Sequence, residues 1–191
     1  SPAYAADLES VRGTWAKLNH ERRELLELLS RFALTPDQAK RWFELSRRAK
    51  AASVAVVDRE ILANPYRIAE CDLGDQTVPA VSIGVIDRGL FPDDVIAAKC
   101  PVPEPSRVES AADRRRVRAA AVSVLRDAAS RGDSLLSAHE VLSRIDRLDL
   151  ARPCVVPLDW FAGNEDFLDG SIRRLDVEIP ESAGSNVTVV P

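Results

Sequence analysis

The 191-residue chain has few of the residue types that most often carry chemistry. It contains three cysteines, two histidines and no methionine, and aromatic residues make up 5% of it. Cys71, Cys100 and Cys154 form no C-x-x-C pair and stand at no metal-ligand spacing with histidine, so we expect no metal site. An odd cysteine count without a signal peptide predicts a reducing, cytoplasmic location.

Long apolar runs and a surplus of one charge are also missing. No run approaches the roughly 20 apolar residues of a membrane helix, so we expect no membrane segment. The 26 basic and 30 acidic residues leave a net charge of −4, so a nucleic-acid contact would need a local basic patch. Because even position 1 is not methionine, we expect a fragment of a longer protein.

Sequence signatures of catalysis and nucleotide binding are absent as well. The chain has no G-x-x-x-x-G-K-[ST], G-x-G-x-x-G, H-E-x-x-H or G-x-S-x-G motif. His139 falls in the first turn of an expected helix, and His20 has no partner at triad or ligand spacing. We therefore expect no catalytic residue and no cofactor in this chain, which should not be an enzyme by itself.

Apolar residues recur at helical spacing along most of the chain and predict a mainly α fold. One long helix is expected over residues 7–30. Thr35 as N-cap, with Pro36 at the first helical position, predicts a second helix. A third is expected over residues 53–63, with its valines facing inward. The Pro- and Gly-rich stretch over residues 72–108 predicts only short helices.

A Pro-rich segment divides the chain into two expected units. Residues 1–99 are predicted to form a helical-hairpin-like bundle of the helix-hairpin-helix kind. Residues 100–112, which include PVPEPS, are predicted to be a linker. Residues 113–191 are predicted to form a small winged-helix-like unit with a C-terminal β-hairpin.

The local patterns of the second unit support that expectation. A helix over residues 113–131 should end at Gly132, and Ser137 with Glu140 fits a capping box that starts the next helix. Asp159 is expected to cap a third helix. The β-branched runs SIRRLDVEI and NVTVV then predict two paired strands, which completes the order of a winged helix.

Basic clusters are the candidate binding features. One lies in KRWFELSRRAK and another in DRRRVR, at a helix start, where cations oppose the helix dipole unless an anion is near. That anion is either Asp113 or a DNA phosphate. Two arginines on the first strand of the expected hairpin are a further candidate. The predicted phosphate contacts are Lys40, Arg41, Arg47, Arg48, Arg114, Arg115, Arg118, Arg173 and Arg174.

Four stretches, taken in order, carry a family resemblance: LLSRFALTPDQAKRWFELS, ILANPYRIAE, SIGVIDRGLFPDD and RRVRAAAVSVLRDAASRGDSLLSAHEVLSRI. Together they resemble the region ahead of the motor in RecD-like ATP-dependent DNA helicases, the class of the exodeoxyribonuclease V alpha subunit. The D-R-G-x-F-P box is similar to that of a bacterial subgroup of these AAA ATPases. The resemblance spans residues 28–169.

The resemblance implies a non-catalytic accessory region that positions single-stranded or forked DNA, or braces the motor. A RecA-like motor with ATP and Mg²⁺ sites should then follow in the same chain. The alternative is a protein–protein interaction scaffold without DNA contact. A winged-helix transcription regulator ranks last, because the expected third helix, LDWFAGNEDFL, is acidic and offers only Asn164 for reading bases.

Overall fold

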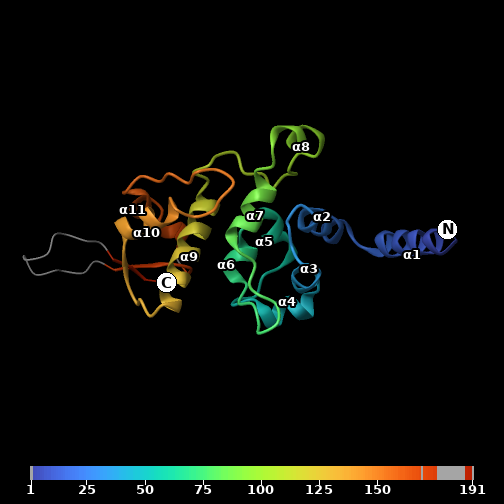
Figure 1. Cartoon of the computed structure of the whole chain (residues 1–191), viewed down its shortest axis with the longest axis horizontal. Coiled ribbons are helices and arrows are strands. Elements are labelled where there is room, and N and C mark those ends of the chain that lie inside the picture. The colour runs from blue at the N-terminus through green and yellow to red at the C-terminus, as the bar shows by residue number, and fades with distance from the viewer. Residues whose placement is uncertain (1, 169, 176–187, 191) are drawn as a thin grey trace, which may run out of the picture.

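The fold is mainly α-helical, as predicted, in a computed structural model that describes all residues except 1, 169, 176–187 and 191 (Figure 1). Its described residues form twelve helices and three short strands. The helices of the first half are α1 (Pro2–Lys17), α2 (His20–Leu29), α3 (Pro36–Phe43), α4 (Leu45–Ala51), α5 (Asp58–Ala63), α6 (Arg67–Cys71), α7 (Ile83–Leu90) and α8 (Asp94–Lys99). The second half contains α9 (Arg114–Ser130), β1 (Leu136–Ser137), α10 (Ala138–Ile145), α11 (Trp160–Gly163), α12 (Glu165–Leu168), β2 (Arg173–Leu175) and β3 (Thr188–Val190).

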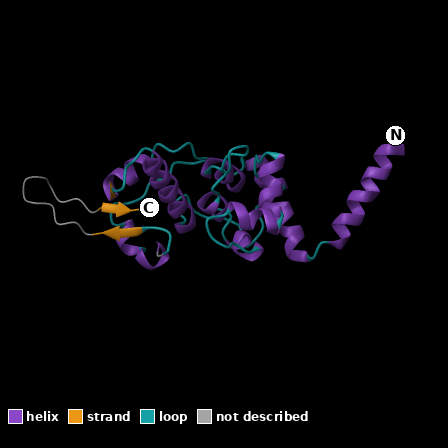
Figure 2. Ribbon diagram, turned by 90° about the horizontal axis from the view of Figure 1, so that it is seen from below, coloured by secondary structure: helices purple, strands orange, loops and turns teal. Residues whose placement is uncertain are grey.

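The single helix expected over residues 7–30 is wrong, because the chain breaks between α1 and α2. Asn19 is extended, and its side chain accepts a hydrogen bond from the backbone N–H of Arg22 at 2.9 Å. This N-cap starts α2 as a separate helix. The leucines of α2 then face the core, whereas α1 projects away from the rest of the molecule (Figure 2).

The helix predicted after Thr35 is confirmed as α3. Its capping box is closed on both sides: Thr35 Oγ1 accepts from the Gln38 N–H, and Gln38 Oε1 accepts from the Thr35 N–H. The helix predicted over residues 53–63 starts later, at α5. The chain before α5 pairs instead with the end of α6, through an isolated bridge between Ala52 and Asp72, so its valines include exposed ones.

The first helix of the second unit is confirmed as α9. It ends in a Schellman arrangement around Gly132, which has a φ of 94°. Ser137 caps α10 by accepting from the Glu140 N–H at 3.2 Å, but the Glu140 carboxylate binds Arg144 instead of closing the box. The third helix appears as the short α11 and α12, and Asp159 makes no side-chain cap.

Three short strands close the second half. They pair antiparallel in the order β1-β3-β2, with Arg174 opposite Val189 and Leu136 on the other side of Val189. The two runs expected as a hairpin therefore lie side by side as β2 and β3. The expected tip, at residues 180–185, lies outside the described residues.

One continuous apolar cluster fills both halves of the chain, from Leu25 on α2 to Ile172 beside β2. Helix α9 packs against α6 and α7, so the second half rests directly on the first (Figure 1). The predicted linker also contacts this body: Ser106 is 1% exposed, and its hydroxyl donates to the Leu62 carbonyl at 2.7 Å. The division at residues 100–112 stays a prediction.

Candidate functional site

Two of the predicted phosphate contacts, Arg41 on α3 and Arg48 on α4, are buried inside the protein. Arg41 is 4% exposed and donates to Asp72 at 2.9 Å and to Asp75 at 3.0 Å. Arg48 is 2% exposed and donates to Asp58 at 2.7 Å. These guanidinium groups are paired with carboxylates, so a phosphate contact by either would require its ion pair to open.

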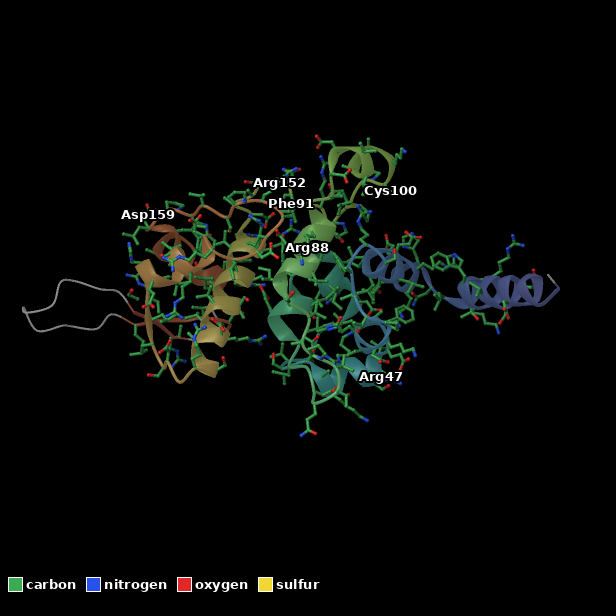
Figure 3. All side chains as sticks on the ribbon, in the orientation of Figure 1. Arg47, Arg88, Phe91, Cys100, Arg152 and Asp159 are labelled. Carbon is green, nitrogen blue, oxygen red and sulfur yellow. The ribbon has the colours of Figure 1, made fainter. Side chains whose placement is uncertain are left out.

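Lys40 and Arg47 lie on the surface of the same two helices. Arg47 is labelled in Figure 3. Arg47 donates to Glu44 at 2.6 Å, and more than two fifths of each side chain is exposed. Exposed ion pairs of this kind contribute little to stability and open easily. Lys40 and Arg47 are therefore accessible to a ligand, and their phosphate contact stays a prediction.

At the start of α9, the carboxylate of Asp113 is the anion that lies near the basic side chains. Asp113 caps the helix through the Arg115 N–H at 2.9 Å and receives the Arg115 guanidinium at 2.8 Å. Burial raises the pKa of Asp113, but the hydrogen bonds from Arg115 outweigh it and keep the pKa below its usual range. The ionised carboxylate thus offsets the local basic charge. Arg114 remains exposed, with its guanidinium over the Phe167 ring at 4.6 Å.

Arg115 and Arg118 fasten α9 to the first half of the chain. Arg115 donates to the Ala63 carbonyl at 2.7 Å. Arg118 forms a bidentate ion pair with the buried Glu70 of α6, in which Nε and Nη2 donate hydrogen bonds at 2.8 and 3.0 Å. Paired guanidinium–carboxylate geometry of this kind is directional as well as strong. Both arginines therefore contribute to the contact between the halves.

The predicted contacts on β2 approach α12, the helix whose Phe167 ring also lies against Arg114 and Arg118. Arg173 is exposed, and Arg174 donates to Glu165 at 2.6 Å. The basic residues named from the sequence therefore do not form one patch. Lys40, Arg47, Arg114 and Arg173 are exposed, but they come from separate elements.

A buried carboxylate, Asp87 of α7, joins three distant segments. It is fully buried and accepts from the Tyr66 hydroxyl at 2.7 Å, from Arg116 Nε at 2.7 Å and Nη2 at 3.0 Å, and from the Ala151 N–H at 2.8 Å. Burial, followed by the charge of Asp87, raises the pKa of Tyr66 far above its usual range. Phe91 lies beneath Arg116 and Arg152 at the edge of this network (Figure 3).

Sequence reasoning missed the residues of this network. Three of them lie in stretches that carry the family resemblance: Tyr66 in ILANPYRIAE, Asp87 in SIGVIDRGLFPDD and Arg116 in RRVRAAAV. The only sequence signal for this network was that these stretches occur together in one chain. It could not have identified the contact, because nothing in a single sequence says which charged residues meet across 29 positions.

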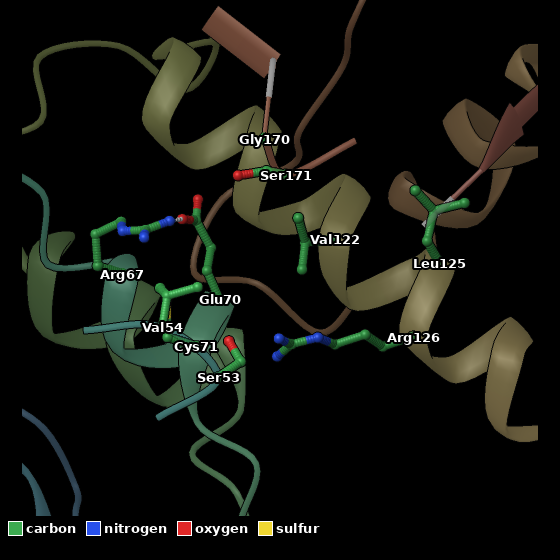
Figure 4. A pocket seen from close by; sticks show the side chains of 10 residues that line it. All are labelled: Ser53, Val54, Arg67, Glu70, Cys71, Val122, Leu125, Arg126, Gly170 and Ser171. Atoms are coloured by element: carbon green, nitrogen blue, oxygen red, sulfur yellow. Dashed lines mark hydrogen bonds and ion pairs between the residues drawn. The ribbon is translucent and has the colours of Figure 1, made fainter. Parts of the chain in front are cut away.

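A cavity of about 190 Å³ opens between α6 and α9 (Figure 4). Its polar lining consists of Ser53, Arg67, Glu70, Cys71, Arg126 and Ser171. Cys71 is buried at its wall, and burial raises the pKa of its thiol, so the thiol is held in its neutral form.

Neither family models nor curated proteins nor solved structures give a match to this chain. In the part of the chain that the structure describes, no group of histidine, cysteine, aspartate or glutamate side chains is arranged to hold a metal ion. No helix in the same residues has the length and apolar character needed to cross a membrane.

Proposed function

We propose that this chain is a non-catalytic accessory region of a RecD-like DNA helicase, and that it braces the motor. The observation that carries the proposal is the network around Asp87. Three stretches that resemble that family meet there, through Tyr66, Asp87 and Arg116. A shared contact gives these separate stretches one physical reason to occur together in a sequence.

The second half adds support from its order of elements. Helix α9, strand β1, helix α10, two short helices and strands β2 and β3 follow one another, with the strands in the order β1-β3-β2. This is the order expected of a winged helix. The short α11 and α12 carry Glu165 and Asp166, so bracing suits this unit better than insertion into a DNA groove.

DNA contact in this proposal is left to the exposed cations Lys40, Arg47, Arg114 and Arg173. With only four such cations on a chain of net charge −4, we expect weak binding that falls steeply with salt. The experiment is fluorescence anisotropy of the chain with forked DNA at low and at physiological salt, repeated on the variant with all four changed to alanine. A bracing role predicts little difference between the two proteins. Tight binding that the variant loses would make DNA positioning the main role.

The reading frame that follows Pro191 decides the family. A G-K-[ST] loop downstream is the expected result, because the phosphate cradle of the motor needs it. A frame without that loop would overturn the proposal. The scaffold alternative would then stand, and the exposed Val95 and Ile96 of α8, at 65% and 50% exposure, are the apolar surface that favours it.

A further inference from the structure

The cavity between α6 and α9 has more positive than negative charge around it. Glu70 accepts from Arg67 at 2.8 Å on one side and from Arg118 at 2.8 and 3.0 Å on the other. Arg126 lines the cavity as a third guanidinium. Among the described residues of the lining, two arginines thus stand with one glutamate, and Arg118 adds a further guanidinium on the other side of Glu70.

Arg126 has the least satisfied guanidinium of the three. Its single hydrogen bond goes to the Ala69 carbonyl at 3.3 Å, and no carboxylate of the described residues forms an ion pair with it. A guanidinium offers five N–H donors, and a partly buried charge is stabilised when those donors are used. Figure 4 shows this side chain reaching across the cavity toward Ser53 and Cys71.

The other polar groups of the cavity are also donors. Arg67 uses one N–H for Glu70 and has others left, and Ser53 and Ser171 bring hydroxyl groups to the lining. Glu70, the one carboxylate among the described residues of the lining, already accepts hydrogen bonds from two arginines. A cavity with spare donors and a filled acceptor is suited to an anion.

We propose that this cavity binds a ligand through a phosphate monoester group. The negative charge of such a group suits the surplus of positive charge, and its oxygens accept hydrogen bonds from several directions. The cavity, at about 190 Å³, leaves room for the phosphate and a small group attached to it. Val54, Val122 and Leu125 offer an apolar wall to that group. The assignment does not depend on the proposed helicase relationship.

Phosphate titration followed by NMR of arginine Nε–Hε signals tests the site. Inorganic phosphate should shift the Arg126 signal in a saturable way, whereas chloride at the same ionic strength should not. Arg126→Gln should weaken phosphate binding about tenfold or more, since it removes a charged donor. Arg131→Gln is the matched control on α9: its ion pair with Asp127 is exposed, and binding should be unchanged.

Binding that Arg126→Gln leaves intact, or the absence of a saturable shift, would overturn the proposal. Circular dichroism of both variants checks that a loss of binding is not a loss of fold. The source of the phosphate is resolved with two oligonucleotides, one with a 5′-phosphate and one with a 5′-hydroxyl. Tighter binding of the 5′-phosphate form assigns the site to a DNA end. Binding of inorganic phosphate without this preference assigns it to a small phosphorylated molecule.

Discussion

At the scale of single residues, the fold depends on the ion pair that Asp87 forms with Arg116 in the interior. Its carboxylate and the Arg116 guanidinium are both fully buried, and four hydrogen bonds end on the carboxylate. The two charges are tolerated in the interior because each supplies the other's partner. Removing one of them leaves the other buried without compensation.

Asp87→Asn should therefore lower the free energy of unfolding by about 3–5 kcal/mol, since Arg116 stays buried and charged. Urea unfolding measures the change. Asp127→Asn is the control, because the Asp127–Arg131 pair is exposed by more than half on both sides and should shift stability by less than about 0.5 kcal/mol. Equal losses of unfolding free energy in the two variants would show that the buried Asp87 pair contributes no more to stability than an exposed pair.

The carboxyl group of Asp75 makes the stability of the folded protein depend on pH in the acidic range. A hydrogen bond from the Thr77 hydroxyl, and then the backbone N–H groups of Val78 and Thr77, lower its pKa from 3.8 to about 2. A carboxylate whose pKa is lower in the folded state contributes stability above the unfolded pKa, and this is lost as the pH falls toward 2. The Asp75 carboxyl signal in NMR should titrate with a midpoint of about 2. Thr77→Val should raise that midpoint; an ordinary midpoint in the unchanged protein would contradict this account.

At the scale of elements, the close approach of α7 to the turn that follows α2 depends on a glycine. A Cβ on Gly89 would lie 2.8 Å from the Arg31 carbonyl oxygen and would overlap the Phe32 ring. Gly89→Ala should destabilise the protein by roughly 1–3 kcal/mol, because backbone as well as side chain would have to move. Thermal unfolding measures this loss.

Gly163 on α11 is the matched control for that prediction. An added Cβ there meets nothing within 4 Å. Gly163→Ala should be neutral, or stabilising by up to about 1 kcal/mol through better helix propensity. If both alanine variants lost stability equally, the loss at Gly89 could not be assigned to its contact with Arg31 and Phe32.

The elements also separate what the sequence could predict from what it could not. Helices α3 and α9 were predictable, because the signals that start and end them, Thr35 and Gly132, are local. The starts of α2 and α5 were missed. A single Asn19 cap interrupts an otherwise helical pattern, and the chain before α5 is held by pairing with residues about 20 positions away.

The candidate site was less predictable than the helices. Arg47 and Arg48 are neighbours in sequence, yet one is exposed and the other is 2% exposed beside Asp58. Which of two adjacent arginines points inward depends on the phase of a short helix and on a carboxylate ten positions away. A basic cluster in a sequence therefore indicates where cations are, but not which of them a ligand can reach.

At the scale of the whole molecule, the two halves share one core. The apolar cluster is continuous from α2 to β2, and α9 contributes buried side chains that contact α6 and α7. Arg116, Arg118 and Arg126 each donate across the same boundary, to Asp87, Glu70 and the Ala69 carbonyl. Neither half can keep its buried groups covered and paired if the other unfolds.

This shared core predicts a single cooperative unfolding transition. Trp42 is buried in the first half and Trp160 lies partly buried in the second, while Trp15 on α1 is 36% exposed. With Trp15 changed to Phe throughout, Trp160→Phe and Trp42→Phe make fluorescence report on one half at a time. Because each half covers the other, urea midpoints from the two variants should coincide with those from far-ultraviolet circular dichroism, after correction for the effect of each substitution. Asp87→Asn, added to either variant, should shift both midpoints together. Two separated transitions would mean that the predicted linker at residues 100–112 joins independent domains, and that the Asp87 network forms only after each has folded.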